Sequence, residues 1–438
     1  MKLAVIGGGS TYTPELVSGI SRERSRLPVD ELVLHDVDPE RRTVVGEMAA
    51  RMLERQGFGG TLIVTDDLDR AVEGAAFVLL QLRVGGQAAR LRDETIPLAC
   101  GCIGQETTGA GGFAKAMRTV PVVLDIADQV KARAEPDAWI VDFTNPVGIV
   151  TRALLDAGHR AIGLCNVAIG VQREVARLLE IDPGDVLVDH VGLNHLTWVR
   201  RLLVEDRDIL PELLENHGTE LAQHAGLPLR LLEELGAIPS YYLRYFYAHD
   251  AVLAAQRDGV PRAAEVAEIE ERLLEIYRDA EVAEKPALLE RRGGAFYSEA
   301  ATALIASLWA DTGDVQVVDV RNDEIVPGLQ ADDVVELPAR IGAAGAEPLS
   351  QAPLAPELLG LVQHVAAYER LTAEAARTRD PVTARKALLT HPLIGQDELA
   401  GSLLEALLAE TTLPLARAAR RASWSNRWRR STDSPRPR

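Results

Sequence analysis

The chain has 438 residues, of which 47% are hydrophobic, enough for a large buried core and for two or three domains. Its formal net charge of −18 disfavours nucleic acid and anionic membranes as main partners. Three cysteines cannot form a disulfide framework, and no apolar stretch at the N-terminus is long enough to cross a membrane. We therefore expect a cytoplasmic protein that binds neither nucleic acid nor a membrane.

The first fifteen residues predict a strand, a tight turn and a helix. An apolar run, Leu3 to Ile6, is followed by the glycine turn Gly7-Gly8-Gly9, and Pro14 fits the first turn of a helix. Such a turn lets the pyrophosphate of a dinucleotide lie against backbone N–H groups at the helix N-terminus. Tyr12 stands where the G-x-G-x-x-G motif has its third glycine, so this motif alone leaves a plain glycine-rich turn as the alternative.

A second predicted strand, Glu31 to Asp36, ends in a carboxylate about where the acidic residue of a dinucleotide fold meets the adenosine ribose. An acidic residue here, rather than a basic one, favours NAD over a cofactor with a 2′-phosphate. The alternative is a surface turn, since Asp38 followed by Pro39 also suits the start of a helix.

Strands and helices continue to alternate through about residue 165. Further strands are predicted at 61–64, 76–82, 139–143 and 161–164, and helices at 68–73, 113–134 and 147–155. Apolar runs between helices indicate a buried parallel sheet, so we predict an α/β fold with a doubly wound, Rossmann-type sheet in residues 1–168. Ligands of such sheets bind beyond the carboxyl ends of the strands. The residues that follow the strands there include Arg83, Asn145, Cys165 and Asn166.

The second half predicts a different organisation. Two β-rich runs at 186–191 and 196–204 precede amphipathic helices at 265–280 and 355–377, and 314–337 suggests a strand pair that turns at Asn322-Asp323. We assign 169–416 to an α+β, mostly helical domain for substrate, metal and oligomerisation, with long helices suited to a homodimer or homotetramer. Residues 417–438 are rich in arginine and predict a solvated or disordered tail.

Five polar clusters interrupt the apolar patterns. They are Gly104 to Gly112, Asp142 to Pro146, Gly163 to Asn166, Gly192 to His195 and Pro239 to Tyr245. In this order, and after the sequence GGGSTYTPE from Gly7, they resemble glycoside hydrolase family 4, the NAD-dependent glycosidases. The resemblance covers all but the tail and is nearest to the 6-phospho-β-glucosidases of that family. Tyr12 is then a feature of the family pattern.

The resemblance implies an NAD site and a metal site. The glycine turn Gly7, Gly8 and Gly9 would bind NAD together with Ser10, Thr11, Asp36 and Arg83. Cys165 and His195 would hold a divalent metal, Mn²⁺ in the family. By residue type alone the pair is more readily a buried thiol and a hydrogen-bonded histidine, and a thiolate does not favour Mn²⁺. Two protein ligands leave positions open for substrate oxygens.

Tyr242 resembles the general base of the family. A phenol with a pKa of about 10 is a poor base at neutral pH, so it needs a nearby cation such as the metal. The alternative is an aromatic helix face at 241–247 that packs into the core.

Four further residues would bind the substrate, a phosphorylated sugar. Arg90 and Arg262 match family residues that contact the sugar phosphate, for which a guanidinium fork is well shaped. Asn145 and Asn166 suit sugar hydroxyls, because an amide both donates and accepts. An asparagine directly after the metal-binding cysteine accompanies the β-specific branch of the family.

The implied reaction is hydrolysis of 6-phospho-β-glucosides without net redox. The sugar is oxidised at C3 by NAD⁺, loses its C2 proton, eliminates the aglycone, adds water and is reduced again. Three alternatives remain open. They are an α-specific or unphosphorylated-sugar glycosidase of the same family, a net dehydrogenase of the lactate or malate type, and an inactive NAD-binding regulator.

Overall fold

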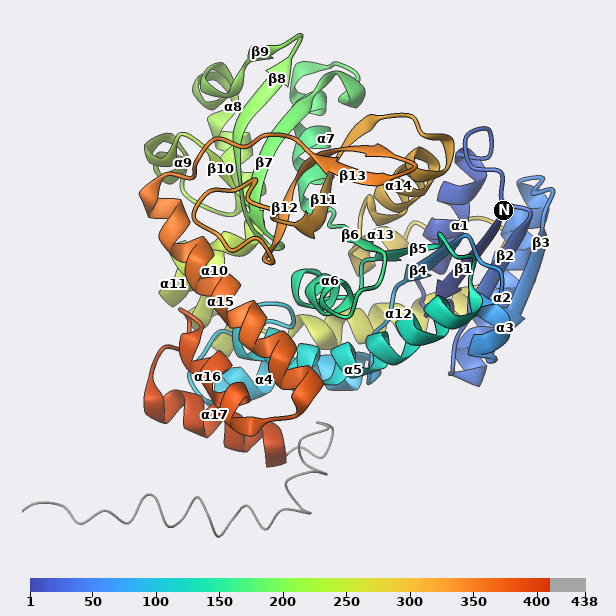
Figure 1. Ribbon diagram of the computed structural model, residues 1–438, viewed down its shortest axis with the longest axis horizontal. Helices are drawn as coiled ribbons and strands as arrows, with labels where there is room; N and C mark the ends of the chain where they lie inside the picture. Colours follow the sequence, from blue (N-terminus) through green and yellow to red (C-terminus); the bar gives the residue numbers. More distant parts are fainter. Residues whose placement is uncertain (410–438) are drawn as a thin grey trace, which may run out of the picture.

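A computed structural model describes residues 1–409 of the chain. One continuous β-sheet runs through it, and the N-terminal strands and the last helices lie at opposite ends of the molecule (Figure 1). The tail predicted over 417–438 lies outside the described residues. No helix within 1–409 is long and apolar enough to cross a bilayer.

The first part of the sheet is parallel, as predicted. Its strands lie in the order β3-β2-β1-β4-β5-β6. Consecutive residues of β1 and β4 are buried alike, which means that helices cover both faces of the sheet. This burial explains the uninterrupted apolar runs and confirms the doubly wound arrangement. The strands are β1 (Lys2–Ile6), β2 (Glu31–His35), β3 (Thr61–Thr65), β4 (Phe77–Leu80), β5 (Trp139–Asp142) and β6 (Ala161–Gly163).

The helices of this part are α1 (Thr13–Arg22), α2 (Pro39–Arg55), α3 (Leu68–Val72), α4 (Gly86–Ala99), α5 (Gly109–Arg133) and α6 (Val147–Asp156). The sequence pattern does not predict α4, because its buried positions include the charged residues Asp93 and Glu94. Helix α5 begins before the predicted Phe113 and includes Gly111, where a Cβ would lie 2.2 Å from the carbonyl oxygen of Gln105. Close packing therefore explains a glycine-rich helix start.

The second half extends the same sheet with antiparallel strands, in the order β6-β11-β12-β7-β8-β10. Two of these strand pairings consist of one residue pair each. Asp319 of β11 lies opposite Gly163 of β6, and Glu336 of β12 lies opposite Gly192 of β7. A division of the chain between 168 and 169 stays a prediction. The added strands are β7 (Leu187–Leu193), β8 (Leu196–Val204), β9 (Arg207–Asp208), β10 (Ile238–Pro239), β11 (Asp314–Arg321), β12 (Val334–Gly342) and β13 (Gly345–Pro348).

The predicted pair in 314–337 is present as β11 and β12, and a turn does begin at Asn322, whose carbonyl accepts the N–H of Ile325 at 2.7 Å. The two strands are joined by a loop over 322–333, and β12 continues to Gly342. Asn322 organises this loop, since its Oδ1 accepts from the N–H of Val326 at 2.8 Å and its Nδ2 donates to the carbonyl of Gln330 at 3.1 Å. The turn at Asn322 is thus only the first part of a longer loop, which the buried asparagine side chain holds together.

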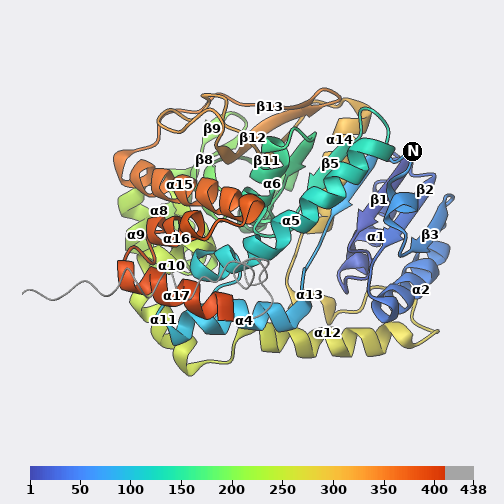
Figure 2. The same cartoon turned by 60° about the horizontal axis from the view of Figure 1, so that its bottom comes forward.

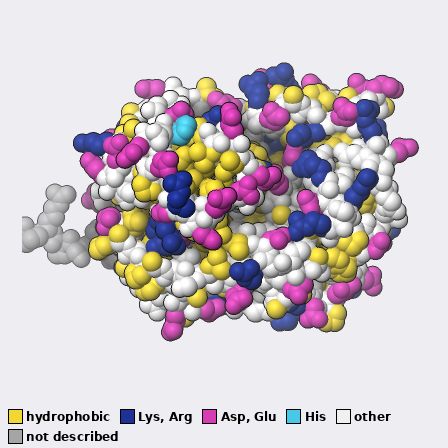
Figure 3. Space-filling model, turned by 90° about the horizontal axis from the view of Figure 1, so that it is seen from above, with side chains coloured by type: hydrophobic (Ala, Val, Ile, Leu, Met, Phe, Trp, Pro, Cys, Tyr) yellow, Lys and Arg dark blue, Asp and Glu magenta, His cyan; other side chains and the backbone are white. Residues whose placement is uncertain are grey.

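The remaining elements are helical, as predicted for the second half. Helix α12 packs against both α4 and α2 along one side of the molecule, and so brings residues of the second half near the glycine turn (Figure 2). Acidic and basic side chains are interspersed on the face drawn in Figure 3. The helices are α7 (Val167–Leu179), η1 (Pro183–Asp185), α8 (Leu210–Ala225), α9 (Leu229–Leu235), η2 (Tyr241–Leu243), α10 (Arg244–Tyr247), α11 (His249–Asp258), α12 (Arg262–Arg278), α13 (Leu289–Arg292), α14 (Tyr297–Ala310), α15 (Pro356–Thr378), α16 (Pro381–Thr390) and α17 (Asp397–Ala409).

Candidate active site

The glycine turn joins β1 to α1 and lies against the end of β2. Gly7 has a φ of 91°, which side chains disfavour, and a Cβ at Gly8 would lie 2.8 Å from that of Leu34. The N–H of Gly9 donates to Oδ2 of Asp36 at 2.8 Å. Asp38 caps α2 by accepting from Glu40 and Arg41, both at 3.0 Å. Asp38 therefore begins α2, as the alternative interpretation expects, while Asp36 still places its carboxylate at the glycine turn.

Tyr12 has a structural reason to replace the third glycine. Its side chain is buried, and its hydroxyl accepts the N–H of Ser298 at 3.0 Å. A Cβ at Gly294 would lie 3.2 Å from its ring. Burial raises the pKa of Tyr12 to about 12, so it stays a neutral phenol. Tyr12 thus fixes residues 294–298 of the second half against the turn.

Arg292 brings a cation from the same segment to the turn. Its Nε donates to Oγ1 of Thr11 at 2.7 Å, and its Nη2 lies 3.4 Å from Oγ of Ser10. Glu270, which is buried, holds the guanidinium at 3.0 Å and also pairs with Arg41 at 3.2 Å. The turn therefore carries two arginines joined by one carboxylate.

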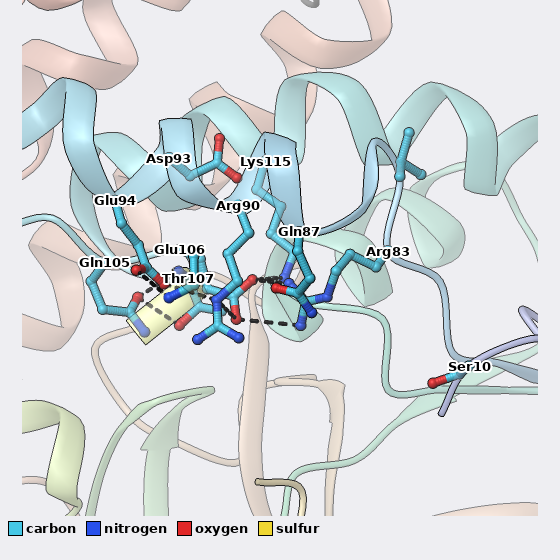
Figure 4. A network of polar contacts seen from close by, with 12 residues as sticks. Ser10, Arg83, Gln87, Arg90, Asp93, Glu94, Gln105, Glu106, Thr107 and Lys115 are labelled. Atoms are coloured by element: carbon cyan, nitrogen blue, oxygen red, sulfur yellow. Dashed lines mark hydrogen bonds and ion pairs between the residues drawn. The ribbon is translucent and has the colours of Figure 1, made fainter. Parts of the chain in front are cut away.

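Three cations converge on the buried carboxylate of Glu106 (Figure 4). Arg83 forms an ion pair with it, Nε of Arg90 lies 3.1 Å from Oε1, and Nζ of Lys115 lies 2.7 Å from Oε2. Burial disfavours the charged form, but Arg83, then Lys115 and Arg90, hold the pKa of Glu106 well below its usual range. The predicted cofactor residue Arg83 and the predicted phosphate residue Arg90 thus share one partner.

The two arginines predicted to bind phosphate are linked through Glu94. Nε of Arg90 donates to Oε1 of Glu94 at 2.8 Å, and the N–H of Ala263 donates to Oε2 at 2.8 Å. Arg262, the residue before Ala263, is 47% exposed and lies 2.8 Å from Glu265. Glu94 therefore joins Arg90 to the start of α12, while the guanidinium of Arg262 itself also donates to the carbonyl of Arg291 at 2.8 Å.

His195 and Tyr242 lie ring against ring, with centroids 3.7 Å apart and planes 12° apart. His195 follows β7 in a left-handed backbone conformation with a φ of 66°. Its Nδ1 lies 3.0 Å from Oγ1 of Thr107, while Nε2 is buried without a hydrogen-bond partner among residues 1–409. Burial, and then Lys115, lower the pKa of His195 to about 3, so the imidazole is neutral. A neutral imidazole with an unpartnered nitrogen suits a metal ligand.

The surroundings of Tyr242 fit both its predicted role as a base and the alternative of an aromatic helix face. It packs beside the small apolar cluster of Ile103, Tyr245 and Leu253, as the aromatic-face alternative expects. Burial, then the charge of Cys165, raise the pKa of its hydroxyl well above the usual value. Tyr242 thus stacks on His195, and it can act as a base only if a positive charge is brought close.

Cys165 is buried directly after β6, near the start of α7. Its Sγ lies 3.9 Å from Oδ1 of Asn166 and 3.9 Å from the hydroxyl of Tyr297, whose ring stacks on Phe143 at 5.3 Å. Burial, then the charges of Glu336 and Asp319, raise the pKa of the thiol well above its usual value. A cation that binds here would therefore have to displace a proton.

No group of three His, Cys, Asp or Glu residues within 1–409 is arranged to hold a metal. Cys165 is nevertheless a buried free thiol, and the buried Nε2 of His195 has no hydrogen-bond partner among residues 1–409, so each suits a metal that takes further ligands from a substrate.

The two asparagines predicted to bind sugar hydroxyls differ in which of their polar atoms are free to bind a ligand. Asn145 follows β5, and its Oδ1 is buried with no hydrogen-bond partner in the described part of the chain. Asn166 instead uses its Nδ2 to donate to the carbonyl of Ala295 at 2.9 Å. Asn145 therefore offers a free acceptor, whereas Asn166 also holds the segment before α14.

Family models cover most of the chain. The model described as Family 4 glycosyl hydrolase matches residues 2–181, and that of the Family 4 glycosyl hydrolase C-terminal domain matches 190–394. The chain belongs to glycosyl hydrolase family 4. The family and the fold class expected from the sequence are thereby confirmed.

Relatives span nearly the whole of this family 4 chain. A Bacillus subtilis protein named as a probable 6-phospho-β-glucosidase is 38% identical over 93% of this chain and 96% of its own. The Thermotoga maritima 6-phospho-β-glucosidase, solved with manganese, NAD⁺ and glucose-6-phosphate, is 36% identical with a TM-score of 0.87, over 93% and 98%. A 6-phospho-α-glucosidase from gut microorganisms, solved with NAD and glucose-6-phosphate, is 26% identical with a TM-score of 0.87, over 94% and 99%.

Sequence reasoning missed four charged or aromatic residues of this family 4 site. Glu106 lies inside the polar run 104–112, so that run could have directed attention to it. Arg292 and Tyr297 carry no comparable signal, since their partners Thr11 and Cys165 are distant in the sequence. Lys115 lies nine residues after its partner Glu106, but it falls within the otherwise apolar start of α5.

Proposed function

We propose that this family 4 chain hydrolyses 6-phospho-β-glucosides with NAD and a divalent metal, Mn²⁺, as cofactors. The observation that carries the proposal is the stack of Tyr242 on His195, whose buried Nε2 has no hydrogen-bond partner among residues 1–409. The relative solved with manganese, NAD⁺ and glucose-6-phosphate supports the same set of ligands.

The glycine turn and its neighbours would bind NAD. Gly7 to Gly9 offer close backbone approach, Ser10 and Thr11 are held by Arg292, and Asp36 lies where the ribose would be. The two arginines beside the turn supply positive charge for the diphosphate. Arg83 lies at the carboxyl end of β4 and would complete the site. When bound, NAD⁺ accepts a hydride from C3 of the sugar and returns it at the end of the cycle.

Cys165 and His195 would hold the metal, with Tyr242 as the base. A divalent ion held there would supply positive charge to oxygens of the bound sugar and to the phenol of Tyr242. Oxidation at C3 acidifies the proton at C2, and Tyr242 removes that proton. The aglycone then leaves C1, water adds at C1, and Tyr242 returns the proton. The buried ring of Tyr242, fixed by its stack on His195, holds the accepting oxygen in place.

Arg90 and Arg262 would bind the 6-phosphate of the substrate. Asn145 and Asn166 would form hydrogen bonds with the sugar hydroxyls. Arg262 is 47% exposed, and Glu94 joins Arg90 to the backbone of Ala263, the residue after Arg262. Preference for the β anomer is supported by identities of 36–38% to the β-specific relatives, against 26% to the α-specific one. Asn166 directly after Cys165 agrees with this choice.

The test is a panel of α- and β-nitrophenyl glucosides, with and without a 6-phosphate, assayed with NAD⁺, Mn²⁺ and reductant. We expect release of nitrophenol from the β-linked 6-phosphate alone, and none when NAD⁺ is omitted. Cleavage of the α-linked or unphosphorylated compounds would assign a different specificity, and steady accumulation of NADH would indicate a net dehydrogenase.

The same proposal places the protein in the cytoplasm as a homodimer or homotetramer of two-domain chains divided at 168/169. The three cysteines are free thiols, which suits a reducing compartment. Exposed apolar residues such as Trp309 and Val382 are candidates for a subunit contact. Light scattering coupled to size exclusion reads the oligomeric state directly.

A further inference from the structure

The polar run 104–112 contains a hydrogen-bond chain that ends on His195. Oγ1 of Thr107 lies 2.8 Å from Oε1 of Gln105 and 3.0 Å from Nδ1 of His195. Oε1 of Gln105 also accepts the backbone N–H groups of Thr107 and Thr108, which identifies it as the oxygen of the amide. Because an amide oxygen can only accept, the hydroxyl of Thr107 donates its proton to Gln105.

The direction of this chain decides which nitrogen of His195 carries the proton. With its own proton directed to Gln105, the Thr107 hydroxyl accepts from Nδ1–H, and Nε2 keeps its lone pair. The opposite tautomer would place a proton on Nε2, which is buried and has no partner among residues 1–409. A buried N–H without an acceptor is costly, so the contacts favour Nδ1–H.

We propose that Thr107, held by Gln105, is a positioning residue that fixes His195 as the Nδ1–H tautomer and leaves the Nε2 lone pair available to a metal. The proposal rests on the proposed function, because it takes His195 as a metal ligand. Metal-binding histidines usually donate their second N–H to an outer partner, and loss of that partner typically lowers metal affinity about 10–100-fold.

The experiment compares Thr107→Val, which removes the hydroxyl at similar volume, with Thr107→Ser, which keeps it. Two-bond ¹H–¹⁵N NMR of the metal-free full chain, labelled with ¹⁵N-histidine, reports the tautomer. The His195 signals are those missing from His195→Asn. We expect Nδ1–H in the unmodified chain and in Thr107→Ser, and loss of that signature in Thr107→Val. Calorimetric titration with Mn²⁺ should show about 10–100-fold weaker binding for Thr107→Val alone.

The neighbouring Thr108→Val is the matched control, since Thr108 donates to Gln105 through its backbone N–H and its hydroxyl makes no capping hydrogen bond at the start of α5. It should keep both the tautomer and the Mn²⁺ affinity. If circular dichroism shows that Thr107→Val misfolds, Thr107→Ala carries the same expectation. An Nδ1–H signature or an Mn²⁺ affinity that survives loss of the hydroxyl overturns the proposal. Failure of the unmodified chain to bind Mn²⁺ instead counts against the proposed function, and the metal-free tautomer still decides the role of Thr107.

Discussion

Replacing Tyr242 by Phe is expected to lower turnover of a 6-phospho-β-glucoside by roughly 10²–10⁴-fold, the usual range for loss of a general base. The substitution removes one oxygen and keeps the ring that stacks on His195 at 3.7 Å. Affinities for NAD⁺ and Mn²⁺ should therefore change little. Steady-state rates with nitrophenyl β-glucoside 6-phosphate, together with calorimetric titration of both cofactors, measure the two quantities.

Tyr241→Phe is the matched control for this substitution. Tyr241 is the adjacent residue, 43% exposed, and its ring lies edge-on to that of Tyr242 at 6.3 Å. Its hydroxyl has no place in the proposed chemistry, so turnover should stay within a few-fold of the unmodified rate. Full activity of Tyr242→Phe would show that Tyr242 is not the base. Its role would then be packing against the apolar cluster that includes Ile103.

Cys165→Ala is expected to abolish activity after the protein has been stripped with a chelator and resupplied with Mn²⁺. The thiol is buried and is one of only two proposed protein ligands, so its loss should weaken Mn²⁺ binding by more than the roughly 10–100-fold seen for outer partners. The free thiol has a raised pKa, so binding of Mn²⁺ to the unmodified chain should also release a proton. Calorimetry in two buffers of different ionisation enthalpy measures that release.

Cys102→Ala is the control for the loss of a buried thiol. Cys102 is also buried, but it lies in the loop after α4, and burial raises its pKa to about 11. Mn²⁺ affinity and turnover should be unaffected by this change. If chelator-stripped Cys165→Ala regained full activity with Mn²⁺, the metal would have to be held elsewhere.

The local sequence was sufficient to predict the parallel strands, the glycine turn and the start of α2. Strands buried on both faces produce uninterrupted apolar runs, so the sequence alone predicts β1 and β4. The glycine turn and the Asp38 cap depend on backbone conformation and on hydrogen bonds between near neighbours, which residue type predicts well. The positions of Asp36 and Cys165 at strand ends follow from the topology of a parallel sheet.

The rest depended on contacts between residues far apart in the chain. Arg292 reaches Thr11 across 281 positions, and no local pattern marks either residue as the partner of the other. The pairing of Arg83 and Arg90 on Glu106 is equally invisible, since charge alone does not say which carboxylate neutralises which arginine. Helix α4 was hidden for a related reason, because its buried positions include the charged residue Asp93, whose partner Arg118 lies on α5.

The central claim is that NAD takes part in a hydrolysis that involves the C2 proton and leaves no net redox change. The most direct measurement is turnover of a 6-phospho-β-glucoside in D₂O with NAD⁺ and Mn²⁺, with NMR of the glucose 6-phosphate formed and absorbance at the NADH band. We predict deuterium at C2 of the product, no accumulation of NADH, and no turnover without NAD⁺. Product that keeps its C2 proton, formed at the same rate in protein free of NAD⁺, would contradict the account.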